Sequence, residues 1–153
     1  MATTYNITHK KGDTFNGREF QLTTYDAYTN LAAFPTTGDP ILIYKALDTG
    51  LFYKWITDEY VLTTDKVYID LTGCSILLQL RRTYDSQAAL SMSSGEGITI
   101  SDATHGIFRI DSQIMDIPAF VYMYDIQITS ASNVVSTYIS GTWTITGDVS
   151  RYV

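Results

Sequence analysis

The chain has 153 residues, a length that suits one domain and is short for two. Apolar residues make up 45% and charged residues 17%, which excludes a disordered segment or a coiled coil. The formal net charge is -6 and no run of Lys or Arg exceeds a pair, so we expect no nucleic-acid partner.

The N-terminal segment MATTYNITHKKGDTF lacks the apolar core of a secretory signal peptide, and no run of about 18 apolar residues occurs in the chain. We therefore expect a protein that is made in the cytoplasm and has no membrane partner. Cys74 is the only cysteine, so no intrachain disulfide can form. Its expected role is that of a small buried apolar side chain.

Alternation of apolar and polar residues predicts a strand in REFQLTT, residues 18–24. Phe20 and Leu22 fall on one face and polar side chains on the other, the period of a half-buried strand. The following segment, YDAYTNLAAFPTTGDP at residues 25–40, has two prolines and no periodicity. We expect it to form a loop.

The next stretch, ILIYKALDTGLFYKWITDEYV, predicts a three-stranded hairpin module at residues 34–64, inserted into a single domain that spans residues 1–153. The turn Asp48-Thr49-Gly50 suits a three-residue loop whose glycine takes a left-handed conformation. The predicted strands cover residues 41–46, 51–56 and 59–63.

Aromatic side chains are concentrated on this hairpin, and strand alternation predicts that Tyr44, Tyr53 and Trp55 form a cross-strand cluster. Each aromatic pair contributes roughly 0.5–1.5 kcal/mol beyond its buried area, and a small hairpin needs such a cluster to hold its shape. The alternative is a contact surface for protein or sugar, because Tyr and Trp also lead interface hot spots. The candidate contact residues are therefore Tyr44, Tyr53, Trp55 and Tyr60.

The remainder of the chain also alternates, and we expect strands in CSILLQLRR, VYMYDIQIT and STYISGTWTIT and two short strands at residues 98–100 and 107–111. The last two are predicted to form a long antiparallel pair near the C-terminus. In the segment SQIMDIPAF we expect a helical turn that Ser112 caps and Pro118 ends. Short strands at this spacing indicate an all-β fold, either a two-layer sandwich or a barrel.

The inventory of reactive side chains does not predict an enzyme. His9 and His105 have no nucleophile motif and no second histidine at ligand spacing, so we expect solvated loop histidines. Asp58 and Glu59 lie near Trp55, but adjacent strand residues point to opposite faces and do not flank one glycosidic bond. Asp125 lies in an apolar strand and is expected to be either a half-buried or an exposed acid. We predict no catalytic residue, no metal site and no cofactor.

Five segments resemble the N-terminal domain of the phage baseplate upper protein, an immunoglobulin-like attachment domain. They are Lys10 to Asp13, Asp70 to Gly73, Gly106 to Ile110, Tyr122 to Ile128 and Gly141 to Ile145. The hairpin is similar to a module of phage tail and fibre proteins with a Y-x-A-x-D-T-x-x-x-Y-x-W core. The residues that match this module are Tyr44, Asp48, Thr49, Tyr53, Trp55, Tyr60 and Val61.

These resemblances imply an immunoglobulin-like antiparallel β-sandwich with an inserted aromatic hairpin. They also imply a non-enzymatic virion structural protein, an adaptor that joins other phage virion proteins in the tail, baseplate or fibre apparatus. It is expected in the tail region rather than the head, as a homo-oligomer or in many copies of a symmetric assembly. Two alternatives remain open: a carbohydrate- or receptor-binding module of the tail, and a head decoration or neck protein.

Overall fold

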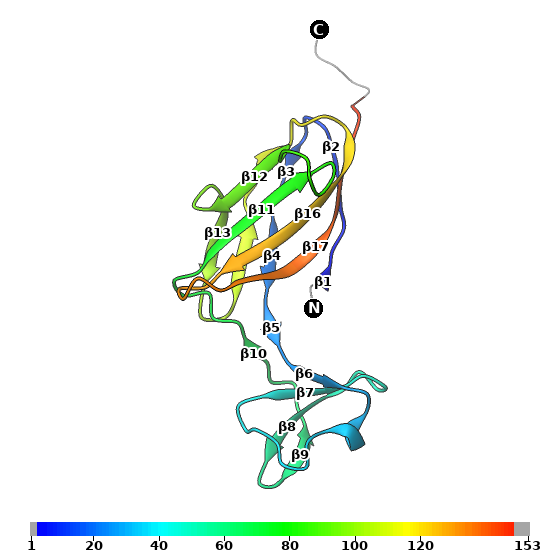
Figure 1. Ribbon diagram of the computed structural model, residues 1–153, viewed down its shortest axis with the longest axis vertical. Helices are drawn as coiled ribbons and strands as arrows, with labels where there is room; N and C mark the ends of the chain where they lie inside the picture. The colour runs from blue at the N-terminus through cyan, green and yellow to red at the C-terminus, as the bar shows by residue number, and fades with distance from the viewer. Residues whose placement is uncertain (1–2, 149–153) are drawn as a thin grey trace.

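The computed structural model describes residues 3–148, which form strands, turns and one short 3-10 helix (Figure 1). No α-helix occurs in this part of the chain, so the prediction of an all-β protein is confirmed. No helix within residues 3–148 is long and apolar enough to cross a membrane.

Nine strands form the main sheet, in the order β1-β17-β16-β11-β12-β13-β14-β4, with β2 also paired to β17. Figure 1 shows that this sheet curls around its own core. Its strands are β1 (Thr3–Thr4), β2 (Ile7–Lys10), β4 (Arg18–Gln21), β11 (Ser75–Arg81), β12 (Leu90–Ser94), β13 (Gly97–Asp102), β14 (Ile107–Ile110), β16 (Phe120–Thr129) and β17 (Val135–Thr146).

The predicted long pair near the C-terminus is confirmed, because β16 and β17 pair antiparallel from Phe120↔Ile145 to Thr129↔Val135. From Tyr122 onward every second residue of β16 faces the core, as the alternation predicts. One core cluster joins β16 and β17 to the strands at the other end of the sheet. Its most deeply buried large side chains include Trp143, Tyr122, Phe108, Leu78, Ile98 and Ile110.

Parallel pairs make the main sheet mixed, where the sequence predicts an antiparallel fold. Both N-terminal strands, β1 and β2, run parallel to β17, and β12 pairs parallel with β13 over a short stretch. The prediction of a purely antiparallel sheet is therefore wrong. Strand direction follows from which distant segments become neighbours, and the N-terminal segment lies along the last strand of the chain.

Gly141 allows the N-terminal segment to lie close to β17. A Cβ at this position would overlap the carbonyl oxygen of Tyr5 and lie 2.8 Å from Asn6 Oδ1. The same contact is held by a hydrogen bond from the Tyr5 N–H to the Ser140 carbonyl oxygen at 2.9 Å.

We expect Gly141→Ala to lower the free energy of unfolding by about 1–3 kcal/mol, because the new methyl group meets backbone atoms rather than a movable side chain. Gly147→Ala is the matched control, since a Cβ there meets nothing within 4 Å. Urea unfolding of both variants measures the difference. Equal stability of the two would show that the N-terminal segment shifts without cost.

A predicted helical turn at residues 112–120 is wrong. Gln113–Ile114 instead forms strand β15, which pairs antiparallel with β3 (Thr14–Phe15). The Gly12 N–H donates a hydrogen bond to the Met115 carbonyl oxygen, and the Met115 N–H donates one to the Asp13 carbonyl oxygen. The Met115 side chain is 1% exposed. Burial of Met115 against the core therefore holds this segment extended. Cys74 is partly buried against the same core.

The small sheet has four strands in the order β6-β7-β8-β9, one more than the predicted hairpin. They are β6 (Asp26–Tyr28), β7 (Ile43–Ala46), β8 (Phe52–Ile56) and β9 (Glu59–Leu62). The last three match the predicted strands within two residues, and Gly50 has the predicted left-handed conformation, with φ of 72°. The expected loop at 25–40 holds two regular elements, β6 and the 3-10 helix Leu31–Ala33 that Asn30 caps.

Two short strands connect the small sheet to the main sheet. They are β5 (Thr23–Thr24) and β10 (Val67–Tyr68), which pair antiparallel with each other alone. Figure 1 shows the small sheet beyond them, at the opposite end of the long axis from the last described residues. The two sheets have separate cores among the described residues.

Candidate functional site

The structure brings the four candidate contact residues together on one face of the small sheet. Tyr44 pairs with Tyr53 across β7 and β8, and Trp55 pairs with Tyr60 across β8 and β9. The ring centroid of Tyr60 lies 5.2 Å from the ring centroid of Tyr44 and 4.7 Å from that of Trp55. The predicted cross-strand aromatic cluster is therefore present, with Tyr60 at its centre.

Phe34 covers this cluster from the segment between β6 and β7, residues 29–42, which we call the covering segment. Its ring centroid lies 4.9 Å from Tyr60 and 5.5 Å from each of Tyr28, Tyr44 and Tyr53. Phe34 and Tyr44 are 8% and 3% exposed. Aromatic side chains from all four strands and the covering segment thus form the core of the small sheet, and Tyr44 presents no surface to a partner.

Hydrogen bonds to the covering segment satisfy two of the hydroxyl groups. Tyr60 donates to the Pro35 carbonyl oxygen at 2.6 Å, and the Asp39 N–H donates to the Tyr44 hydroxyl oxygen at 2.8 Å. Burial, and then the nearby Tyr44 and Tyr28 hydroxyls, raise the pKa of Tyr60 above its ordinary value. These bonds lock the covering segment onto the aromatic face.

Trp55 is half-buried between two neighbours. Its ring packs against Tyr60, and the backbone at Gly38 approaches so closely that a Cβ there would lie 2.7 Å from the indole. A sugar-binding platform needs an open ring face. These two contacts favour packing as the role of Trp55.

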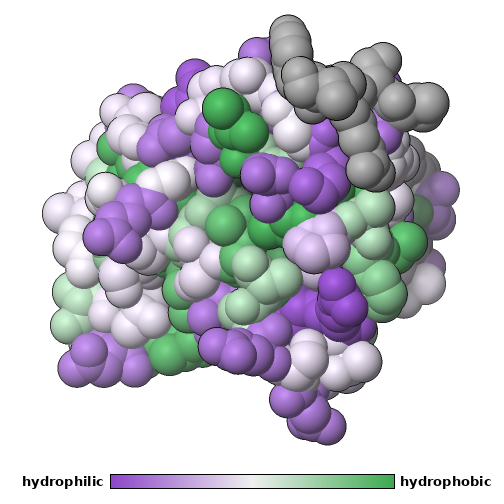
Figure 2. Space-filling model, turned by 90° about the horizontal axis from the view of Figure 1, so that it is seen from above, coloured by the Kyte–Doolittle hydropathy of each residue, from purple (hydrophilic) through white to green (hydrophobic). Residues whose placement is uncertain are grey.

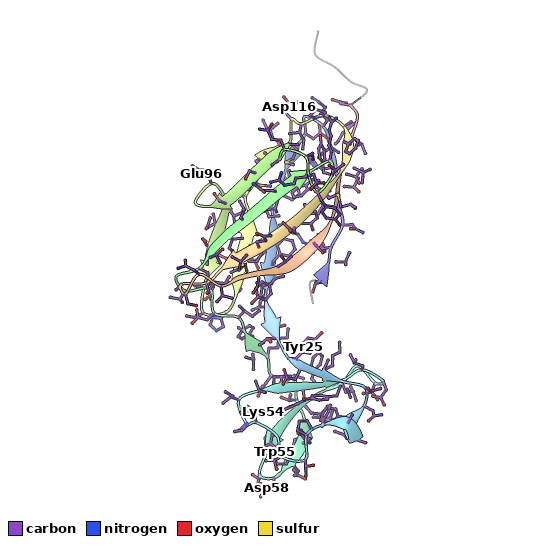
Figure 3. The ribbon with its side chains drawn as sticks, in the orientation of Figure 1. Tyr25, Lys54, Trp55, Asp58, Glu96 and Asp116 are labelled. Carbon is purple, nitrogen blue, oxygen red and sulfur yellow. The ribbon has the colours of Figure 1, made fainter. Side chains whose placement is uncertain are left out.

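The opposite face of the small sheet carries a second group of aromatic residues. Tyr25 and Phe52 pack with centroids 5.4 Å apart, and the Lys45 ammonium group lies 5.2 Å from both ring centroids. Lys54 on this face pairs with Asp65 at 3.3 Å. Figure 3 shows Tyr25 near the main sheet and Asp58 at the far tip.

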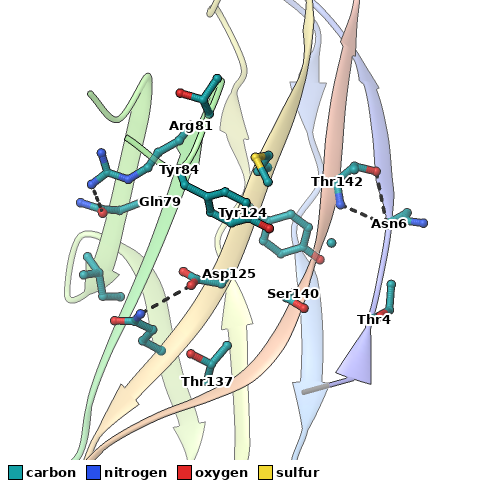
Figure 4. A pocket seen from close by; sticks show the side chains of 15 residues that line it. Thr4, Asn6, Gln79, Arg81, Tyr84, Tyr124, Asp125, Thr137, Ser140 and Thr142 are labelled. Carbon is teal, nitrogen blue, oxygen red and sulfur yellow. Dashed lines mark hydrogen bonds between the residues drawn. The ribbon is translucent and has the colours of Figure 1, made fainter. Parts of the chain in front are cut away.

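A polar groove of about 720 Å³ lies on the main sheet, on the face away from the core (Figure 4). Its floor comes from β11, β16 and β17, with β1 and the turn after β11 at its sides. Asp125 lies in this groove and is half-buried. Fifteen residues line it: Thr4, Asn6, Leu77, Gln79, Arg81, Thr83, Tyr84, Met123, Tyr124, Asp125, Gln127, Thr137, Ser140, Gly141 and Thr142.

Tyr124 lies under this groove, and its hydroxyl donates a hydrogen bond to the Tyr5 carbonyl oxygen. Burial, with a smaller contribution from Tyr5, raises the pKa of Tyr124 to about 12 from an ordinary value of 10.0. The raised pKa stabilises the folded state below pH 10, and this contribution is lost as the pH rises toward 12.

We therefore expect Tyr124 to be the last tyrosine to ionise in an alkaline titration. The absorbance of the phenolate near 295 nm measures this ionisation. Tyr124→Phe should remove this late component and leave the others in place. Tyr84→Phe is the control, because Tyr84 is 85% exposed. A late component that persists without Tyr124 would contradict the assignment.

Both histidines lie outside this groove. His105 is exposed and lies 3.0 Å from Asp102, and this hydrogen bond lowers the pKa of Asp102. His9 contacts the backbone of Asp13. Within residues 3–148, no group of three or more His, Cys, Asp or Glu side chains is placed to hold a metal ion.

Sequence reasoning missed two residues of these sites. Phe34 lies in a segment without periodicity, and no local pattern distinguishes it from Leu31, which is exposed. Tyr84 lies in a turn, and its place over the groove depends on how the strands pair. No local pattern marks it.

The chain has no match among protein-family models, curated proteins or solved structures.

Proposed function

We propose that this protein is a non-enzymatic structural component of a tailed-phage virion, an adaptor that joins neighbouring proteins of the tail, baseplate or fibre apparatus. One observation carries the proposal: of the fifteen exposed large apolar side chains among residues 3–148, eight lie in residues 25–62. Apolar side chains concentrated on one exposed part of a protein are typical of contact surfaces. The eight are Tyr25, Leu31, Ile41, Leu47, Leu51, Ile56, Val61 and Leu62.

An adaptor needs a second surface, and the opposite end of the molecule offers one. Figure 2 shows hydrophobic side chains gathered near the centre of the end of the main sheet. Ile114 and Phe120, which flank Asp116 in the chain, are 66% and 42% exposed, and Figure 3 places Asp116 at this end. Two apolar surfaces at opposite ends suit a protein that connects two neighbours.

The strand order supports the finer reading of an immunoglobulin-like sandwich. Strands β4, β14 and β13 form one group, and β12, β11, β16 and β17 form another, with β1 and β2 parallel to β17. Among the described strands, the short β12–β13 pair alone links the two groups in the main sheet, and their side chains share one core. Immunoglobulin-like domains divide their strands in a comparable way. The sandwich would hold the small sheet and the opposite end at a constant separation.

The resemblance to phage proteins also supports the proposal. The segments Tyr122 to Ile128 and Gly141 to Ile145 lie in the two longest strands, and Gly141 makes the close contact with the N-terminal segment. Three of the residues that match the tail module, Tyr44, Tyr53 and Tyr60, lie in the small-sheet core. Part of the resemblance thus rests on residues that hold the fold.

Immunogold electron microscopy tests the proposal on virions of a phage that carries this gene. We expect label at the tail tip, baseplate or fibre base. Label on the capsid or neck would instead assign a decoration or connector role. The proposal would be overturned if neither labelling nor mass spectrometry detected the protein in purified virions.

The contact surface is tested by replacing Leu47 and Leu51 by serine in the same gene. Both are exposed, at 58% and 45%, so the variant should fold as the native protein does and fail to enter virions. The matched control replaces Val134 and Val135, which are 60% and 58% exposed at the end of the β16–β17 turn and the start of β17. Normal incorporation of the first variant would remove these leucines from the contact.

A further inference from the structure

The polar groove on the main sheet has the features of a site for a small polar molecule. Its floor consists of side chains from neighbouring strands, which a packed core supports from behind. Asp125 lies directly opposite Gln79 on β11 and Ser140 on β17. A row of carboxylate, amide and hydroxyl groups therefore crosses three strands at one level, held in place by the sheet.

Tyr84 stands at the edge of this groove without a partner. It is 85% exposed, and no hydrogen bond or ring contact involves it among the described residues. Figure 4 shows its ring reaching over the sheet from the turn that follows β11.

The turn that carries Tyr84 is well anchored. Thr83 N–H donates to Ser86 Oγ at 3.0 Å, and Ser86 N–H donates to the Thr83 carbonyl oxygen at 3.2 Å. Arg81 Nη1 also donates to the Ser86 carbonyl oxygen. Because the turn is already ordered, the protein loses little conformational entropy when a ligand binds. The Tyr84 ring is therefore positioned to stack on a bound group.

The groove is lined by one positive and one negative side chain, Arg81 and Asp125, and each is hydrogen-bonded to a neighbouring glutamine. Arg81 donates to Gln79 Oε1 at 2.7 Å, and Gln127 Nε2 contacts Asp125 Oδ2 at 3.5 Å. Among the described residues, Gln127 is the one side chain bonded to the Asp125 carboxylate. One hydrogen-bonded arginine and one carboxylate do not attract a phosphate backbone, and most of the lining residues have polar or charged side chains, which does not suit a lipid.

We propose that this groove binds a neutral oligosaccharide. Sugar hydroxyls both donate and accept hydrogen bonds, which matches Asp125, Gln127 and the hydroxyl groups of Thr137 and Ser140. The apolar C–H face of a pyranose ring stacks on Tyr84. The proposal is independent of the adaptor role, and it moves sugar binding away from the aromatic hairpin, whose rings pack on one another.

The test uses the full chain on an array of immobilised neutral hexose and N-acetylhexosamine oligomers, with polyuronates as acidic probes. The affinity for the best-bound soluble oligomer is then measured by isothermal titration calorimetry. We expect binding to neutral oligomers that Tyr84→Ala weakens by about two- to tenfold, as loss of one stacking contact would. Asp125→Asn should also weaken it, because a carboxylate accepts stronger hydrogen bonds than an amide.

Tyr25→Ala is the matched control, because Tyr25 is also an exposed tyrosine, at 42%, but lies on the small sheet. It should bind as the native chain does. Circular dichroism of each variant confirms the fold. Absence of binding to every neutral oligomer at millimolar concentration would overturn the proposal, and so would binding that the Tyr84 and Asp125 variants leave unchanged. Binding that Tyr25→Ala abolishes would place the sugar on the small sheet and equally overturn it.

Discussion

Trp143→Ala is expected to lower the free energy of unfolding by about 3–5 kcal/mol, a large part of the stability of a domain of this size. Trp143 is fully buried on β17, and its ring centroid lies 5.1 Å from Phe15 and 5.8 Å from Tyr124. The truncation removes contacts with both rings and leaves a cavity where the N-terminal segment meets the sheet. Urea unfolding followed by far-UV circular dichroism measures the loss.

Trp143→Phe separates packing from hydrogen bonding at this position. The indole Nε1 is buried and has no hydrogen-bond partner among the described residues. Phenylalanine therefore removes volume and no hydrogen bond, and we expect a cost of about 1–2 kcal/mol. If Trp143→Phe proves as unstable as Trp143→Ala, the indole N–H has a partner whose loss matters, such as an internal water molecule.

Phe34→Ala is expected to unfold the small sheet while the main sheet stays folded. Phe34 contacts four tyrosine rings, and within residues 3–148 only Tyr44 and Ala46 are buried with it in that core. The loss of about 3–5 kcal/mol exceeds what so small a core can absorb. Hydrogen exchange measured by mass spectrometry should show loss of protection in residues 26–62 and unchanged protection in β11, β16 and β17.

Leu31→Ala is the control for this experiment, because Leu31 lies in the same covering segment but is 44% exposed. The two tryptophans of the chain offer a second measurement. In Trp143→Phe, fluorescence comes from Trp55 alone and reports on the small sheet. Equal loss of protection in both sheets would show that they unfold as one unit through β5 and β10.

The strands were accessible from local sequence because the side chains of a strand alternate between two faces. Tyr122, Tyr124, Ile126 and Ile128 identify a strand and its buried face without reference to any partner, and the structure has them so. The turn at Gly50 was equally local, since a left-handed residue between two strands favours glycine. The aromatic cluster followed from the hairpin, whose register depends on that turn.

The errors arose where distant contacts decide the local conformation. Asp26–Tyr28 has no strand periodicity, and it is a strand because it pairs with β7. The segment around Met115 is extended because that side chain enters the core and its backbone bonds to the N-terminal segment. In both, tertiary contacts outweigh a weak local preference.

The sequence by itself determined an all-β chain, most of its strands, and the hairpin that brings Tyr53, Trp55 and Tyr60 together. These features depend on residues close in the chain, through alternation and turn geometry. The tertiary structure alone decided the parallel pairing of the N-terminal strands, the cover that Phe34 provides, and the groove beneath Tyr84. Periodicity shows which face of a strand is apolar, but it does not show which strand lies beside it. A surface assembled from several strands therefore emerges only when the chain folds.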